Sequence, residues 1–332
     1  MLTLFSLYLS AISTVVCAIV ANYTTLLLSR ALIGFSVGIN FAIHCVMMAE
    51  HVSNKTILDK ILFISTMMYS VGGVWSAILG YLLLDVVGWR VFILLTSLPF
   101  FIPPIFMVHL CFAGNSGPQV EEIETEQIQM LPKETVTISN FVARTTKLGI
   151  YCAVNTFQGW LTILLVPRLI QVLKIKEAEP NSDCSVTVTQ GKELLLLGLV
   201  TSAAILGRLF IHFTRKQFSF RKLQIIVALL NVASFGGMLA QDHLAVVVTT
   251  NFIVKFLFGI TAMTSGYILY DVNYFGAERF ALGSSVAVAV SLMGGAVGTA
   301  MVAFAPLLSV IITALVLSAL QILVVLSMTE VQ

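Results

Sequence analysis

The chain consists largely of apolar segments about as long as a lipid bilayer is thick. A transmembrane helix needs about 20 apolar residues, and inside lipid its backbone N–H and C=O groups must bond within the helix. About ten segments meet this length. They lie near residues 2–21, 24–47, 61–84, 91–113, 148–171, 193–213, 223–241, 244–268, 281–303 and 306–328. The sequence therefore predicts an all-α polytopic membrane protein.

The composition supports this class and argues against several others. Of 332 residues, 58% are hydrophobic and only 10% are charged, against about 25% charged in a typical soluble domain. The net charge of +2 is small, and no basic run is interleaved with aromatic residues, so a nucleic-acid partner is not expected. The 5 cysteines include no CxxC pair, and we predict neither a metal site nor a cofactor.

Positive charge is divided unequally between the two sets of loops that alternate along the chain. One set holds Lys55, Lys60, Lys133, Arg144, Lys147, Arg215, Lys216, Arg221, Lys222 and Arg279, and the other holds Arg90, Lys174, Lys176 and Lys192. Cytoplasmic loops of membrane proteins are enriched in Lys and Arg. We therefore expect both termini in the cytoplasm, with either the plasma membrane or an intracellular vesicle membrane as the location.

One long polar loop divides the spans into four and six. Residues 114–140 are polar and acidic, which is typical of a solvated linker rather than of a catalytic carboxylate cluster. We expect a partial N-terminal bundle at 1–113, a cytoplasmic linker at 114–147 and a six-helix C-terminal bundle at 148–332.

Two spans share a pattern of a cation, a glycine four residues later, and an acid at the cytoplasmic end. Parallel internal repeats of this kind are characteristic of transporter folds. The two sets are Arg30, Gly34 and Glu50, and Lys255, Gly259 and Asp271.

Several longer motifs carry a resemblance to a known family. RALIGFSVG (30–38), LDVVGWRVFILLTSLP (84–99) and RKQFSFRK (215–222) resemble the fourth helix, the entry to the sixth helix and the eighth-to-ninth loop of major facilitator transporters. YCAVNTFQGW (151–160) and AERFALGSSVAVAVSLMGGAVG (277–298) are similar to the branch related to synaptic vesicle protein two, which adjoins the organic cation and anion transporters.

The resemblance implies a major facilitator fold of six plus six helices, of which this chain is expected to hold helices three to twelve. The first two helices are expected to be absent. The sequence departs from the family pattern at several positions: Ile211 stands where an acid is usual, Thr214 where a glycine is usual and Ile57 where an arginine is usual.

Four polar residues follow one face of the fifth span. Tyr151, Asn155, Gln158 and Thr162 are spaced so that they share one side of a helix. A polar face in lipid must turn inward to partners or water. As the seventh helix of the resembled fold, this face would line the substrate cavity; the alternative is hydrogen bonding that packs helices together.

Cations and a histidine within other spans are further candidates. Lys255 is near mid-membrane, where a charge usually faces a cavity or a counter-charge. It is a candidate for binding an anionic substrate group, and the alternative is a buried salt bridge or a contact with a backbone carbonyl. Arg30 either lines the cavity or anchors the helix at the outer headgroups. Asn40 and His44 are candidate cavity residues, with a packing role as the alternative for His44. Arg168 and Arg208 are expected to snorkel to the interfaces.

Charged residues at cytoplasmic helix ends form gates between the halves in this superfamily. The resemblance implies such salt-bridge roles for Glu50, Asp271, Glu278 and Arg279.

These patterns predict a secondary transporter of small organic solutes, organic ions among them, that works by alternating access. The partners are then a small organic solute and the lipid bilayer. The alternative is a truncated or degenerate, non-transporting membrane paralogue with a binding or regulatory role. An enzyme is not expected, because the sequence holds no HExxH or GxSxG motif.

Overall fold

The computed structural model describes residues 2–20, 22–51, 55–97, 101–102, 105, 136–177, 190–214, 217–239 and 244–328. Within these ranges the regular secondary structure is helical throughout. The main elements are α1 (Leu2–Ile19), α2 (Tyr23–His51), α3 (Lys55–Ser97), α5 (Ile138–Glu177), α6 (Gln190–Thr214), α7 (Phe220–Gly237), α8 (Leu244–Leu269), α9 (Val272–Phe275), the 3₁₀ helix η3 (Ala277–Arg279), α10 (Phe280–Phe304) and α11 (Leu307–Ser327).

Seven helical segments of the described part are long and apolar enough to cross a membrane. They are Thr24–Phe41, Thr56–Ser97, Ile138–Leu169, Glu193–Thr214, Ala245–Leu269, Phe280–Phe304 and Leu307–Ser327, and Leu4–Ile19 is a shorter apolar helix. The prediction of an all-α polytopic membrane protein is confirmed. The predicted span at 223–241 corresponds to α7, and 98–113 lies almost wholly outside the described residues.

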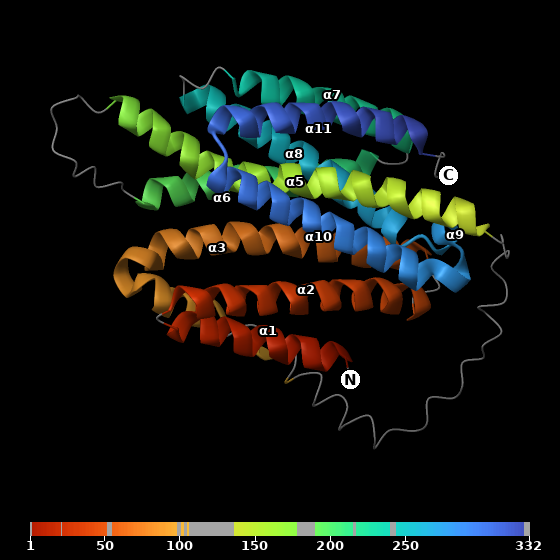
Figure 1. Cartoon of the computed structure of the whole chain (residues 1–332), viewed down its shortest axis with the longest axis horizontal. Coiled ribbons are helices and arrows are strands. Elements are labelled where there is room, and N and C mark those ends of the chain that lie inside the picture. Colours follow the sequence, from red (N-terminus) through yellow and green to blue (C-terminus); the bar gives the residue numbers. More distant parts are fainter. Residues whose placement is uncertain are drawn as a thin grey trace.

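The predicted third span and the start of the fourth both lie in α3, which is interrupted at Gly88. This glycine has φ 74 and ψ 163, a conformation that other residues rarely adopt. Figure 1 shows the chain turning back at the far end of α3. The glycine of the GWR motif therefore allows the turn between these two helices.

The helices run along one common axis and alternate in direction (Figure 1). Helices α1, α2 and α3 form one side of the molecule, α7 and α11 form the opposite edge, and α5 and α10 lie between them. Helices α1 to α3 make up one helix group, and helices α5 to α11 make up the other. The two groups contact each other where α3 packs on α6 and α8 and where α2 packs on α10. Both termini lie toward the same end of the helices, which is also where α5 and α10 begin.

The division at residues 113 and 148 stays a prediction. Helices α5 to α11 contact one another, and α6 and α8 also contact α3. The linker expected at 114–147 is described only from Val136 onward, where α5 begins at Ile138, so residues 114–135 lie outside the described part.

Glycines set the closest helix contacts. At Gly207 of α6 an added Cβ would clash with the carbonyl of Phe256 in α8, and at Gly259 of α8 it would clash with the carbonyl of Ala204 in α6. Two backbones therefore touch at this crossing. Lipid is as apolar as a side chain, so close backbone packing of this kind is a main source of helix association in membranes.

We predict that Gly259→Ala separates α6 from α8. The new methyl group meets backbone, which cannot rotate away, and overpacking of this kind costs about 1–3 kcal/mol. The thermal unfolding midpoint of the purified protein in detergent should fall. Gly34→Ala is the control, because an added Cβ there meets nothing within 4 Å. Equal midpoints for the two variants would contradict the close crossing.

Candidate functional site

Two buried cations, Arg208 of α6 and Lys255 of α8, lie beside the crossing of these helices. Gly207 packs on the backbone of Phe256. Arg208 follows Gly207 in α6 and Lys255 precedes Phe256 in α8, so the two cations are at similar depth. Their side chains are 2% and 3% exposed. Two positive charges therefore lie at similar depth on neighbouring helices. No acidic residue of the described helices lies in the middle of a span.

Lys255 points from α8 toward α5. Its Nζ donates a hydrogen bond to the carbonyl oxygen of Gly159 at 2.6 Å and lies 4.8 Å from the centroid of the Phe258 ring. A Cβ on Gly159 would clash with the same ring, so glycine is needed for this arrangement. A carbonyl and an aromatic face stabilise the ammonium group but do not neutralise it. Of the two structural alternatives, a salt bridge or a carbonyl contact, the structure has the carbonyl contact.

Arg208 has fewer partners than Lys255. Its Nε and Nη1 atoms find no hydrogen-bond partner among the described residues. Its Cζ lies 6.0 Å from the centroid of the Tyr69 ring in α3, at the outer limit of a cation–π contact. The expectation that Arg208 snorkels to the interface is wrong, because its side chain is buried against its neighbours.

One side of α3 carries the residues that face this site. Phe63 stacks on His212 of α6 with ring centroids 4.0 Å apart, and Thr66 donates to the sulfur of Met263 in α8 at 3.0 Å. Together with Tyr69 these residues recur every three positions along α3. Near the cations, α3 therefore contacts α6 and α8 through ring contacts and a hydroxyl–sulfur hydrogen bond. These helices can separate there without breaking any of the ion pairs described for this part of the chain.

The predicted polar face of α5 is buried among the helices of the C-terminal part. Tyr151 donates to Gln224 Oε1 of α7 at 2.5 Å, and Gln224 donates to Thr264 of α8 at 2.8 Å. These bonds join α5, α7 and α8. Thr162 bonds only to the carbonyls of its own helix.

A second part of this network joins α5 to α7 and α11. Gln158 donates to Ser318 at 2.8 Å and accepts from Asn231 at 3.2 Å. Gln321 donates to Asn155 at 2.7 Å, while Asn155 Nδ2 and Gln321 Oε1 have no partner among the described residues. The contacts of this face are those expected of inter-helix packing, and its role in a cavity stays a prediction.

The structure does not bring the remaining cavity candidates to the cation pair. Arg30 is exposed on α2, and Asn40 accepts a hydrogen bond from Ser6 of α1 at 2.6 Å. The His44 ring lies edge-on to Tyr270 near the end of α8, with centroids 6.2 Å apart. Their substrate roles stay predictions.

The gate candidates have local partners. Asp271 accepts from the backbone N–H of Asn273 at 3.0 Å and so caps α9. Arg279 donates to the carbonyl of Val136 at 2.8 Å, and Glu278 is exposed. The side chain of Glu50 lies outside the described part. Gating by these residues stays a prediction.

The fold is that of a polytopic membrane protein with a helical bundle. The profile of the Major Facilitator Superfamily matches residues 1–299. The chain belongs to this superfamily. No curated protein matches it significantly.

Sequence reasoning missed Arg208 as a member of the site. The residue is about one and a half turns from the end of α6, a distance that a long side chain can snorkel. The available signal was Gly207 directly before it, because a small residue in a transmembrane helix marks the face that packs most closely.

We predict that Gln158→Leu destabilises the protein through the network of α5, α7 and α11. The change leaves Ser318 and Asn231 without this partner, at a cost of about 1–3 kcal/mol, measured as a lower unfolding midpoint. Thr162→Val is the control, since its hydroxyl bonds only within α5. An unchanged midpoint together with weakened solute binding would favour the cavity role instead.

Proposed function

We propose that the protein is a secondary transporter of small organic solutes that carry a negative charge, and that it works by alternating access. The observation that supports this most is the pair of buried cations, Arg208 and Lys255, with no carboxylate at their depth. Superfamily membership supports transport in general.

The energetics of the pair favour an anionic solute. A cation at mid-membrane costs roughly 2.5–3.5 kcal/mol on insertion scales, and such residues usually mark a solute or ion pathway. Two like charges side by side raise that cost. An anion that reaches both groups gives the free N–H groups of Arg208 an acceptor and balances the charge of Lys255.

The position of the pair suits alternating access. Arg208 lies where α6 packs on α3, so the site lies on the surface shared by the two helix groups. Close contacts there involve small residues, since a Cβ on Gly73 would meet Thr201 at 3.1 Å and one on Gly198 would meet Ala77 at 3.4 Å. We propose that movement of α3 relative to α6 exposes the cations to the solute.

Finer assignments follow from the sequence motifs. We propose that the chain belongs with the branch related to synaptic vesicle protein two, on the strength of residues 151–160 and 277–298. We also propose that the end that holds both termini is cytoplasmic, because the loops at that end hold most of the Lys and Arg residues.

Uptake of organic anions, cations and neutral solutes into proteoliposomes tests the transport proposal. We expect saturable uptake of one or more anions. Absence of saturable flux for the full-length, correctly inserted protein would contradict the proposed function and favour a non-transporting paralogue.

We further predict that Lys255→Met weakens the affinity for the transported anion about tenfold to a hundredfold, since a charged hydrogen bond contributes about 1.5–3 kcal/mol. Arg208→Met should have a similar effect, and Arg208→Lys should retain part of the affinity. Arg168→Met is the control, because that arginine donates to the carbonyl of Val302 away from the pair. Unchanged KM values for folded Lys255→Met and Arg208→Met would show that the pair does not recognise the solute.

A further inference from the structure

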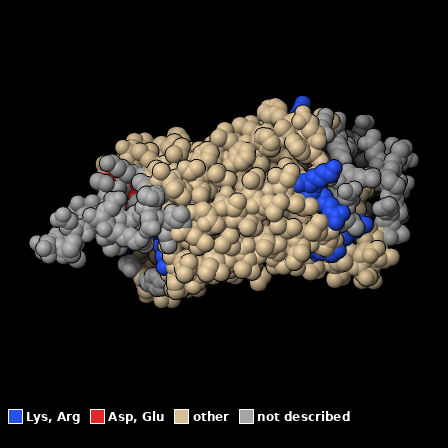
Figure 2. Space-filling model, turned by 90° about the horizontal axis from the view of Figure 1, so that it is seen from above, with Lys and Arg blue, Asp and Glu red and all other residues tan. Residues whose placement is uncertain are grey.

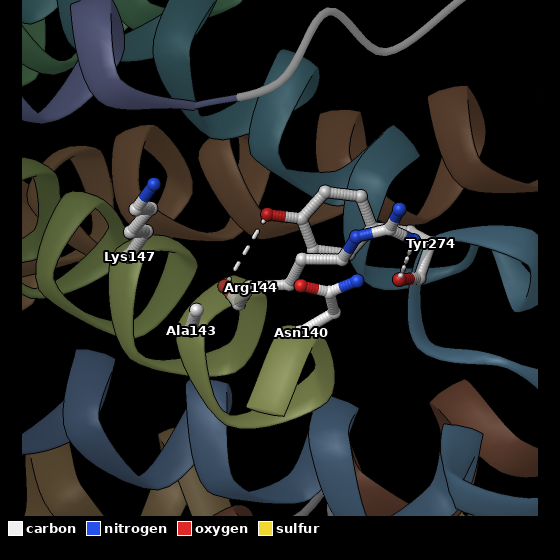
Figure 3. A pocket seen from close by; sticks show the side chains of 5 residues that line it. All are labelled: Asn140, Ala143, Arg144, Lys147 and Tyr274. Carbon is white, nitrogen blue, oxygen red and sulfur yellow. Dashed lines mark hydrogen bonds between the residues drawn. The ribbon is translucent and has the colours of Figure 1, made fainter. Parts of the chain in front are cut away.

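A pocket of about 140 Å³ opens at the end of the molecule where both termini lie. It is lined by Asn140, Ala143, Arg144 and Lys147 of α5 and by Tyr274 of α9. Figure 3 shows Asn140 and Arg144 beside Tyr274, with Lys147 further along α5. Two cations and an amide line the pocket, and none of the five residues is acidic.

Backbone carbonyls hold both cations in place. Arg144 Nη1 donates to the carbonyl of Tyr274 at 3.0 Å, and its Cζ lies 5.8 Å from the Tyr274 ring centroid. Lys147 Nζ donates to the carbonyl of Ser327, at the end of α11, at 2.5 Å. Guanidinium and ammonium groups each have further N–H donors. The two charges are therefore oriented by these bonds but not neutralised by them.

Tyr274 adds no negative charge to the pocket. Its hydroxyl donates to the carbonyl of Arg144 at 3.2 Å. Burial raises the pKa of Tyr274 to about 12, with the Arg144 guanidinium opposing the rise. The hydroxyl therefore stays protonated at neutral pH and remains a donor.

The pocket adjoins further positive charge and exposed apolar surface. Arg221 of α7 donates to the carbonyl of Leu326 in α11, and Lys222 is exposed beside it in the chain. Figure 2 shows Lys and Arg gathered near one end of the face formed by α7 and α11. Leu323 and Leu326, on the last two turns of α11, are 63% and 44% exposed. Cations next to lipid-facing apolar side chains mark the level of the headgroups.

We propose that this pocket binds the phosphate of an anionic glycerophospholipid, with the acyl chains along the end of α11. Phosphate oxygens accept the remaining N–H donors of Arg144 and Lys147 in charge-assisted hydrogen bonds. Leu323 and Leu326 belong to the last two turns of α11, whose end is tied to the pocket by the hydrogen bond from Lys147 to the Ser327 carbonyl. A free phosphate uses the cations alone, whereas a phospholipid uses both surfaces, so we assign the site to a lipid.

Titration of the purified full-length chain in detergent, followed by native mass spectrometry, tests this site. The probes are phosphatidylglycerol, phosphatidylcholine and glycerol phosphate. Phosphatidylglycerol should bind most tightly. Each cation near an anionic lipid surface contributes enough for roughly a fivefold change, so Lys147→Gln should weaken binding about fivefold and Arg144→Gln with Lys147→Gln about 30-fold.

The control is Lys60→Gln, which removes the same charge from an exposed lysine on α3 and should leave binding unchanged. Arg144→Lys keeps the charge and should retain most of the binding if Arg144→Gln disturbs folding. An equal loss for Lys60→Gln, or equal binding of phosphatidylcholine, would overturn the site. Binding of glycerol phosphate as tight as that of phosphatidylglycerol would reassign it to a free phosphate. None of these results depends on transport activity.

Discussion

The crossing of α6 and α8 fixes the geometry on which the candidate site depends. Because Gly207 and Gly259 carry no side chain, the two backbones come into direct contact. In lipid, such contact replaces the hydrophobic driving force that assembles helices in water. The same contact fixes the depth of the residues beside it, and these include Arg208 and Lys255. A looser crossing would let either side chain move away from the other.

This arrangement places two buried cations on neighbouring helices, whereas many other polar groups of the described spans bond within their own helix or to a neighbouring helix. Most hydroxyls of the spans bond to carbonyls of their own helix, as Thr250 and Thr299 do. The polar face of α5 finds partners on α7, α8 and α11. Arg208 is different because its group is charged as well as buried, and its Nε and Nη1 atoms find no acceptor among the described residues. Protein groups that are buried, charged and unpaired are commonly functional.

The sequence predicted the helices better than it predicted the site. Hydropathy is a local property, so each predicted span falls on a described helix or, in the fourth, continues beyond the described residues. The burial of Lys255 was likewise anticipated from its distance to both ends of its span. The burial of Arg208 was not predicted. It depends on which residues of α3 and α8 face this side chain, and only the packing of the helices determines that. The two repeat glycines show the same limit. A Cβ added at Gly259 would meet the backbone of α6, whereas one added at Gly34 would meet nothing within 4 Å.

The basic pocket and the cation pair differ in which helices surround them, so we expect ligands at the two sites to have different effects. The basic pocket is built by α5 and α9 with the end of α11, and α3 contributes no lining residue. A lipid bound there would contact these helices and not the lining of a site on α3. The cation pair lies instead against Tyr69 of α3. A ligand shifts a conformational equilibrium only if it binds one state more tightly than the other. A ligand at the cation pair would gain or lose contacts when α3 moves, and a ligand at the pocket would not. On these two proposals, lipid at the pocket would add to stability, while control of the opening would rest with the solute.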